Sequence, residues 1–405
     1  MPLQPRIGGR ALLALHRRTP GIAFQALLHG PLRRGVGMNL LLIERCNLTC
    51  AYCFFAGSLN ARPAERGGHD IISEENFRLA LRYGRDFVAT GLRDSVNLLG
   101  GEPTLHPRFR ELLAIARSRE FALPNGAPLP VNVFSNGIFE PQIAEFLGET
   151  PCGLMLNINH PLSYRGRLWR RLNANLDIIA RGRGREPFSL SLNLFAPDQE
   201  VDFVFDLLER YGARHLRVDV AKPNSAATNT HVGFEALPAM MPLFEKIAER
   251  CQKDGIALNT DCCLPVCAVD NERLARLKEA GIFLSFACPG AIDVTPGLQL
   301  FYCGPLKHLS FGRIDGYADA KEIVETIEET VQTLRWEVPT RKACETCKWR
   351  TLDICQGGCL AFKPLATAER RSHDEEDLHA ERLWPKPQAG ADRGTGAIAT
   401  GCGGG

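Results

Sequence analysis

Short apolar runs alternate with longer amphipathic segments from residue 38 to about residue 253. The short runs are rich in β-branched residues and predict strands, whereas the longer segments carry apolar residues at helical spacing. A chain that alternates strand and helix in this way forms parallel strands joined by helical crossovers. The expected strands are 38–43, 95–99, 131–134, 154–159, 189–195 and 215–221, and the expected helices are 73–90, 108–119, 141–147, 167–181, 201–211 and 234–253.

Six such units, rather than eight, predict an α/β fold built as a partial (β/α)6 TIM-like barrel that is open along one side. The first of these helices has a clear start signal. Ser73 is expected to be its N-cap, and Glu74 and Glu75 fall in its first turn, where acidic side chains are favourable.

Composition divides the 405 residues into four parts. Residues 1–37 hold six arginines and no acidic residue, so they form either a peripheral basic lead-in or a basic face for an acidic peptide. Residues 38–254 form the barrel. Residues 255–368 form a small cysteine-rich domain that metal ligation would organise, with an amphipathic helix at 319–334. Residues 369–405 are charged and then glycine-rich, so we expect a largely disordered tail.

Fifteen cysteines in a chain of this length indicate metal ligation rather than a disulfide scaffold, because most of them occur in tight groups. Cys152 and Cys251 stand alone and are expected to be small buried residues. So many free thiols suit a reducing cytoplasm. The 48 basic and 46 acidic residues nearly cancel and no run of eighteen apolar residues occurs, so neither nucleic acid nor a membrane is an expected partner.

Cys46, Cys50 and Cys53 follow the first expected strand with the spacing C-x3-C-x2-C. In a (β/α) barrel, the loops that follow the strands form the catalytic face. Three thiolates on a four-iron cube would leave one iron open for a substrate or cofactor. A zinc knuckle with a distant fourth ligand is the alternative, although zinc sites more often show paired C-x2-C spacing.

This motif resembles the signature of the radical S-adenosylmethionine (SAM) superfamily, with Tyr52 at the family's aromatic position. The resemblance implies that the open iron of a [4Fe-4S] cluster chelates the methionyl amine and carboxylate of S-adenosyl-L-methionine. It implies that reductive cleavage yields a 5′-deoxyadenosyl radical that abstracts hydrogen from a substrate. It further implies that Tyr52 packs near the adenine, and that an electron donor such as flavodoxin or ferredoxin is a partner.

Gly100, Gly101 and Glu102 follow the second expected strand in a Gly-Gly-Glu-Pro string. Paired glycines let a backbone approach a ligand closely. The string resembles the family's GGEP motif, which holds the methionyl amine. Ser135 and Asn136 follow the third strand in a Ser-Asn-Gly string that resembles the family's ribose-binding segment.

Later strand ends carry further polar residues. Asn193 is a candidate cofactor ligand, and Lys222 is a candidate catalytic residue on the substrate side, because inward polar residues at these strand ends reach the catalytic face of a barrel. For each residue taken alone, a structural hydrogen bond is an equal alternative.

The cysteines of the C-terminal part have the spacing C-x2-C-x7-C-x3-C over residues 344–359, preceded by Cys288 and Cys303. This pattern resembles the SPASM domain, which carries auxiliary [4Fe-4S] clusters in peptide-modifying radical SAM enzymes. It departs from that pattern in three ways: Gly297 lies one residue too far from Cys303, the middle gap is seven rather than five, and the last cysteine is absent. The residues that could stand in for it are His373, Asp374, His379 and Cys402.

The resemblance implies one or two auxiliary clusters. Cys288, Cys303 and Cys359 would ligate one, with a fourth ligand from among Cys262, Cys263 and Cys267. The second would be ligated by Cys344, Cys347 and Cys355, with a non-cysteine ligand or an open iron. A structural zinc ribbon is the alternative for 344–359. A spare thiol, for which we name Cys267, could instead donate hydrogen to a substrate radical.

Three functions remain open on the sequence. The chain is expected to be a radical SAM oxidoreductase or maturase that modifies a peptide or protein side chain. The second possibility is a radical SAM oxidoreductase or epimerase with a small-molecule substrate such as a sugar or amino acid, and the third is a non-catalytic zinc or iron–sulfur protein.

Overall fold

The computed structural model describes residues 37–55, 59, 69–185, 187–279, 284–288 and 290–364. These residues belong to one unit of structure that ends at Pro364. The expectations for residues 1–36 and for the tail 369–405 lie outside the described residues.

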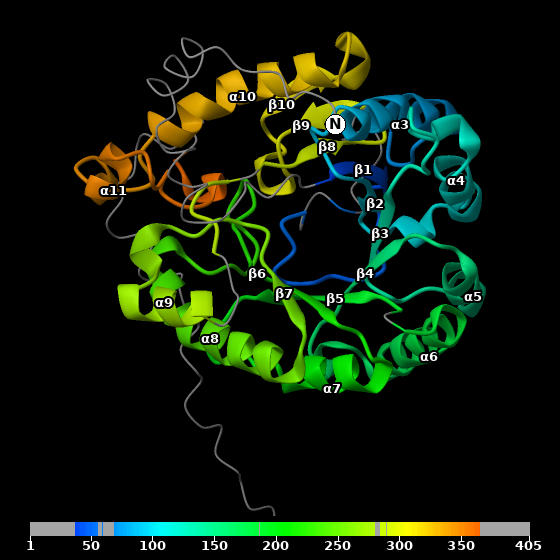
Figure 1. The fold of residues 1–405 in the computed structure, drawn as a ribbon, viewed down its shortest axis with the longest axis horizontal. Helices are drawn as coiled ribbons and strands as arrows, with labels where there is room; N and C mark the ends of the chain where they lie inside the picture. The colour runs from blue at the N-terminus through cyan, green and yellow to red at the C-terminus, as the bar shows by residue number, and fades with distance from the viewer. Residues whose placement is uncertain are drawn as a thin grey trace, which may run out of the picture. The chain divides into compact units, whose positions relative to one another are not determined.

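Six parallel strands form the centre of the sheet, and each pairs with the next one along the chain (Figure 1). The register places Leu40 beside Leu98 and Leu98 beside Val133, and all three side chains are buried. The predicted alternation is therefore confirmed. The strands are β1 (Met38–Ile43), β2 (Val96–Gly100), β3 (Val131–Ser135), β4 (Gly153–Asn157), β5 (Ser189–Leu194) and β6 (His215–Val220).

Helices connect these strands and form an arc outside them (Figure 1). They are α3 (Glu74–Ala89), α4 (Phe109–Ala116), α5 (Pro141–Glu149), α6 (Gly166–Arg183), α7 (Asp202–Tyr211) and α8 (Leu237–Asp254). The hydroxyl of Ser73 accepts a hydrogen bond from the backbone N–H of Asn76, as the cap prediction required. Helices α7 and α8 each end at a glycine in the left-handed conformation, Gly212 and Gly255.

The sheet continues beyond the six predicted strands. β7 (Ala257–Asn259) pairs in parallel with β6, and β8 (Ile292–Val294) pairs in parallel with β1. β9 (Gln299–Phe301) and β10 (Ser310–Arg313) follow β8 as antiparallel neighbours. The sequence predicted six strands, and the described part of the chain adds these four to the same sheet. These strands have only three or four residues each, which is too short for a periodic signal.

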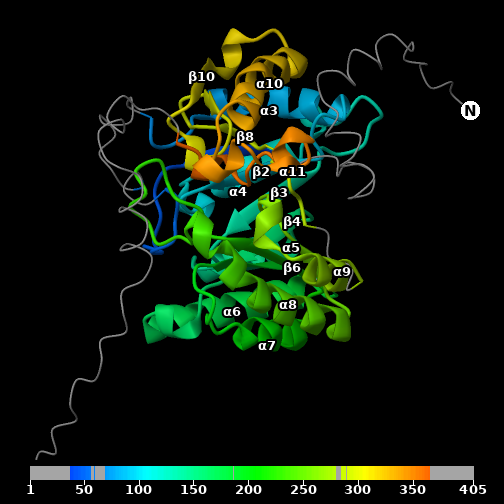
Figure 2. The ribbon, with the colours of Figure 1, turned by 90° about the vertical axis from the view of Figure 1, so that its left-hand side faces the viewer.

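The two edges of the described sheet are β10 and β7, so the barrel is partial, as expected. Helix α10 (Ala320–Trp336) occupies the segment where the sequence predicted a helix, and it runs along α3 (Figure 2). Tyr83 of α3 donates a hydrogen bond to the carbonyl of Tyr317 at 2.6 Å, and Asp86 accepts one from the N–H of Ala320 at 2.8 Å. The short helices α9 (Asn271–Glu279) and α11 (Lys348–Thr351) were not predicted.

A row of polar side chains crosses four neighbouring strands. Asn39 donates to Asp293 at 2.6 Å and accepts from Asn97 at 2.8 Å, and Asn97 in turn accepts from Asn132 at 2.8 Å. Burial raises the pKa of Asp293 to about 7, although the hydrogen bond from Asn39 acts in the opposite direction. This row ties β8 of the cysteine-rich region to the barrel strands.

None of the described helices has the length and apolar character that a membrane crossing requires.

Candidate active site and thiol groups

The loop after β1, which we call the thiol loop, carries Cys46, Cys50 and Cys53. The backbone N–H of Cys53 donates to the carbonyl of Cys50 at 3.1 Å, and the N–H of Leu48 donates to the sulfur of Cys46 at 3.4 Å. Burial raises the pKa of the Cys46 thiol to about 11, and the nearby Glu102, Cys50 and Cys53 act in the same direction. The loop therefore brings the three thiols within electrostatic reach of one another at the carboxyl end of the first barrel strand.

Two side-chain amides hydrogen-bond to sulfurs of this loop. Asn136, which follows β3, donates to the sulfur of Cys46 at 3.7 Å. Asn159, which follows β4, donates to the sulfur of Cys50 at 3.3 Å. Hydrogen bonds of this kind fix the orientation of metal ligands and tune the potential of a cluster. The position of Asn159 after a barrel strand is the sequence signal that marks it as a candidate ligand.

The paired glycines join the end of β2 to the thiol loop. The N–H of Gly101 donates to the carbonyl of Ile43, and the N–H of Glu102 donates to the carbonyl of Arg45, both at 2.8 Å. A Cβ atom at Gly100 would collide with the carbonyl oxygen of Ile43, and one at Gly101 with that of Arg45. The close approach that these glycines permit is therefore to the chain that leads into the cysteines.

Glu102 is fully buried and connects the ends of β2 and β3. Its Oε1 accepts hydrogen bonds from the hydroxyls of Thr104 at 2.6 Å and Ser135 at 2.8 Å, and from the N–H of Thr104. Its Oε2 accepts from the N–H of Asn136 at 2.8 Å. Burial raises the pKa of this carboxyl group, against these hydrogen bonds. Since Oε2 has a single donor among the described residues, it can accept a further N–H.

Tyr52 of the thiol loop lies in a network of side-chain amides that come from β4, from the segment after it and from β5. Its ring stacks on Phe195 with centroids 5.6 Å apart, and its hydroxyl accepts from Asn157 at 2.8 Å and donates to Asn159. Asn193 donates to Asn157 at 2.8 Å. Both predicted cofactor residues, Tyr52 and Asn193, are thus brought into one hydrogen-bonded group that also reaches Cys50.

Lys222 lies elsewhere, with its side chain 3% exposed. Its ammonium group donates to the carbonyl of Val220 at 2.9 Å and to Asp219 at 3.4 Å. Burial lowers its pKa, but Asp219 and the thiols of Cys262, Cys359 and Cys263 raise it by more. The structure therefore places Lys222 beside the C-terminal thiols.

Three thiols of a larger group, Cys262, Cys263 and Cys359, lie beside this lysine. Hydrogen bonding from Cys263 lowers the pKa of Cys288 to about 6 against its burial. Burial, followed by the nearby Cys288 and Cys359, raises the pKa of Cys303 well above its usual value. Cys262 hydrogen-bonds to Cys359, which together with burial raises the pKa of Cys262. The first thiol group therefore comprises Cys263, Cys288, Cys303 and Cys359, with Cys262 at its edge beside Asp219.

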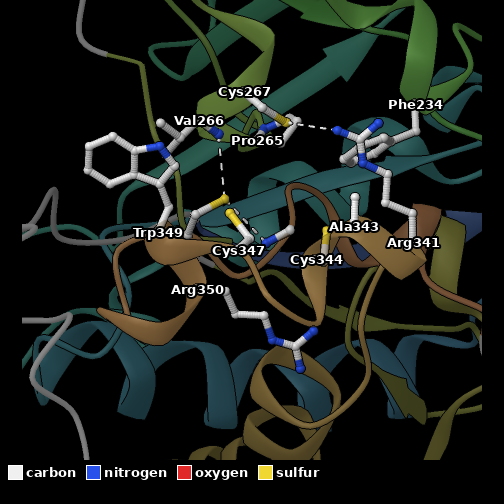
Figure 3. A pocket seen from close by; sticks show the side chains of 12 residues that line it. Phe234, Pro265, Val266, Cys267, Arg341, Ala343, Cys344, Cys347, Trp349 and Arg350 are labelled. Atoms are coloured by element: carbon white, nitrogen blue, oxygen red, sulfur yellow. Dashed lines mark hydrogen bonds between the residues drawn. The ribbon is translucent and has the colours of Figure 1, made fainter.

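The second thiol group comprises Cys267, Cys344, Cys347 and Cys355, which line one pocket (Figure 3). The N–H groups of Val266 and Gly357 donate to the sulfur of Cys355 at 3.5 and 3.4 Å. Arg341 donates to the sulfur of Cys267 at 3.7 Å. Sequence reasoning missed this grouping, because no spacing rule links Cys267 to cysteines so far along the chain.

The two remaining described cysteines differ from each other. Cys251 is buried in α8, as expected. Cys152 is half-buried and accepts a hydrogen bond from Arg183 at 3.2 Å, so the expectation of a buried apolar residue is wrong for it.

Sets of thiolates are the ligands that iron–sulfur clusters use. Among the described residues, no three histidine, cysteine or acidic side chains converge closely enough to hold a single metal ion. A tetrahedral zinc ion needs four ligands at about 2.3 Å from one point. In contrast, a cube binds each thiolate at a different iron and so takes more widely spaced sulfurs. Soft thiolate ligands with N–H donors to the sulfurs are the surroundings that such clusters have.

Comparison with known proteins agrees with this geometry. The model of the Radical SAM superfamily matches residues 40–173. The mycofactocin maturase MftC of Mycobacterium tuberculosis is 24% identical over 382 residues, which cover 87% of each chain. A probable GTP 3′,8-cyclase of Methanosarcina acetivorans is 27% identical over 194 residues, covering 45% of this chain and 53% of the cyclase. The crystal structure of Streptococcus suis SuiB bound to S-adenosylmethionine superposes with a TM-score of 0.56 at 14% identity, over 89% of this chain and 80% of SuiB.

The family match spans β1 to β4 and thus includes the thiol loop, the paired glycines and Glu102. The likeness to SuiB supports the fold, including the cysteine-rich C-terminal region. Residues 40–173 therefore form a radical SAM domain, which a cysteine-rich C-terminal region follows, and the enzyme uses a [4Fe-4S] cluster and S-adenosyl-L-methionine.

Proposed function

We propose that this enzyme is a maturase that modifies a side chain of a peptide. Support comes from the extent of the matches: the likeness to the mycofactocin maturase covers 87% of this chain, whereas the likeness to the GTP cyclase covers 45%. A second SuiB structure, with a TM-score of 0.55, is bound to the precursor peptide SuiA. The observation that carries the proposal is the presence of two thiol groups beside the barrel, in a chain whose likeness to a maturase extends through them.

Cys46, Cys50 and Cys53 would hold the SAM-binding cluster. When bound, the cluster and S-adenosyl-L-methionine supply the 5′-deoxyadenosyl radical that abstracts hydrogen from the substrate. The free position on Oε2 of Glu102 would accept the methionyl ammonium, next to Cys46. Ser135 and Asn136 would hold that carboxylate in place, and Gly100 and Gly101 keep β2 against the thiol loop.

Tyr52 and Asn193 would line the other side of the SAM site, because their network reaches Cys50 through Asn159. The aromatic pair of Tyr52 and Phe195 gives this side an apolar face against which a purine could pack. Asn157 fixes the Tyr52 hydroxyl and so sets the tilt of the ring.

The first thiol group would hold an auxiliary cluster through Cys263, Cys288, Cys303 and Cys359. Lys222 and Arg335 place positive charge beside its sulfurs, which would compensate the negative charge of four thiolates. Lys222 acts here as a neighbour of the cluster, and its contacts give no support to a role on the substrate. We propose residues 38–254 and 255–368 as the two functional regions, one for SAM and one for auxiliary clusters.

A small-molecule substrate is the second candidate, and the match to the GTP cyclase favours it for the barrel alone. In either case a small electron-transfer protein such as flavodoxin or ferredoxin would reduce the enzyme. The fourteen described cysteines are all free thiols, so we propose that the enzyme works in a reducing cytoplasm.

The test uses the anaerobically reconstituted full chain with dithionite and SAM. A synthetic peptide encoded beside the gene and GTP are offered in parallel, and products are analysed by mass spectrometry. We expect a mass change in the peptide that requires SAM, and none in GTP. Conversion of GTP with an unchanged peptide would overturn the maturase proposal while leaving the enzyme class intact.

A further inference from the structure

The second thiol group raises the question of its fourth ligand. Cys344, Cys347 and Cys355 lie close in sequence, but no cysteine follows Cys359 before Cys402. Either the tail returns to complete the site or a residue from upstream does so.

Two segments of equal spacing lie side by side at this point. One runs from Cys263 to Cys267 and the other from Cys355 to Cys359, so each has the form Cys-x3-Cys. The N–H of Val266 in the first segment donates to the sulfur of Cys355 in the second at 3.5 Å. Gln356, in turn, donates to the sulfur of Cys263 at 3.4 Å.

Small residues allow this contact. Gly358 has a φ of +80°, and a Cβ there would lie 3.0 Å from the Cδ atom of Pro265. The N–H of Ala268 donates to the carbonyl of Pro265 at 2.9 Å, which closes the turn that carries Cys267. A larger residue at position 358 would push the two segments apart.

Each segment thus contributes to both thiol groups. Cys263 and Cys359 belong to the first group, whereas Cys267 and Cys355 belong to the second. Figure 3 shows Cys267, Cys344 and Cys347 around the space lined by the second group.

We propose that Cys267 is the fourth ligand of a second auxiliary cluster, so that the segments 263–267 and 355–359 each give one thiolate to each auxiliary cluster. This inference rests on the proposed auxiliary clusters and specifies how they are held. It removes the need for a ligand from the tail, since the four thiols of the second group all come from residues before Pro364.

Two consequences follow for the second cluster. Four thiolates occupy all four irons, so the cluster has no open position at which a peptide could bind, and its role is electron transfer or support of the fold. Arg341 donates to Cys267 at 3.7 Å and also pairs with Glu235, just before α8. The cluster is thereby linked to the barrel through one charged side chain.

The experiment compares full-length variants after anaerobic reconstitution. Cys267→Ala and Cys355→Ala each remove one thiol of the second group. The matched control carries His373→Ala, Asp374→Ala, His379→Ala and Cys402→Ala together. Wild type should hold about twelve iron atoms per chain, for three four-iron clusters. We expect both single variants to fall to about eight, or to show a three-iron cluster by electron paramagnetic resonance, while the control stays at the wild-type value.

A second measurement needs no substitution. Iodoacetamide applied anaerobically to the reconstituted wild-type protein should label Cys402 and leave Cys267 unlabelled, and removal of iron with a chelator should expose Cys267. Labelling of Cys267 in the loaded protein, or loss of iron only in the tail control, would overturn the proposal. Wild type with about four iron atoms, which still cleaves SAM, would overturn the auxiliary clusters themselves and leave the enzyme class standing.

Discussion

Replacing Glu102 by glutamine keeps the shape of the side chain and removes its charge. Three hydrogen bonds converge on Oε1 and one on Oε2, so the amide oxygen of the variant should take the Oε1 position. The amide nitrogen would then face the N–H of Asn136 and could not accept from it. It would also be unable to accept from the methionyl ammonium.

The magnitude follows from these contacts. A hydrogen bond to a charged group contributes about 1.5–3 kcal/mol, so the Kd for SAM should rise about 10- to 150-fold. Leaving the Asn136 N–H unpaired costs about 1–3 kcal/mol of stability. Part of this cost is offset, because the variant no longer buries a carboxylate whose pKa is raised. The free energy of unfolding should therefore fall by less than the cost of the unpaired Asn136 N–H alone.

Isothermal titration of SAM into the anaerobic, reconstituted protein measures the Kd, and iron analysis shows that the cluster is retained. Glu145→Gln, on the exposed face of α5, is the matched control and should bind SAM as wild type does. A Glu102→Gln protein with full iron content and an unchanged Kd for SAM would refute the role given to this carboxylate.

Three further predictions concern the scaffold. Because the pKa of Asp293 is raised to about 7, the stability that its protonated form provides is present at acidic pH and is lost as the pH rises toward 7. Urea unfolding of wild type should therefore show that the free energy of unfolding declines by a few kcal/mol over this rise in pH. The Asp293→Asn protein should lack this decline. Gly101→Ala should displace the thiol loop and abolish SAM cleavage, whereas Gly316→Ala, whose Cβ meets open space, should leave iron content and SAM cleavage unchanged. Ser73→Ala should lower the free energy of unfolding by about 1 kcal/mol through loss of the α3 cap, and an equal stability of the two proteins would contradict the cap assignment.

The barrel could be predicted from sequence because each element carries its own local signal. Ser73 with Glu74 marks a helix start, and the apolar run of β1 is bounded by polar residues. The strands of the cysteine-rich region carry no such signal, because β8 consists of Ile292–Val294 and is stabilised by pairing with β1. Long-range pairing of this kind cannot be recognised from a three-residue segment.

The SAM-binding site and the auxiliary thiol groups also differ in how far their residues can be predicted from local sequence. Cys46, Cys50 and Cys53 lie within eight residues, so their spacing alone predicted a common centre. The grouping of Cys267 with Cys355 depends on a contact between segments 89 residues apart, as the hydrogen bond from Val266 shows. Lys222 could be recognised as a strand-end residue, but the thiols that surround it come from later in the chain.

The most direct test of the account compares 5′-deoxyadenosine formation by wild type and Cys50→Ala, both reconstituted anaerobically and reduced with dithionite in the presence of SAM. Wild type should form 5′-deoxyadenosine. The variant should form none, and its iron content should fall by about four atoms per chain while the two auxiliary clusters remain. Normal turnover by Cys50→Ala would contradict the assignment of the three thiols after β1 as the ligands of the SAM-binding cluster.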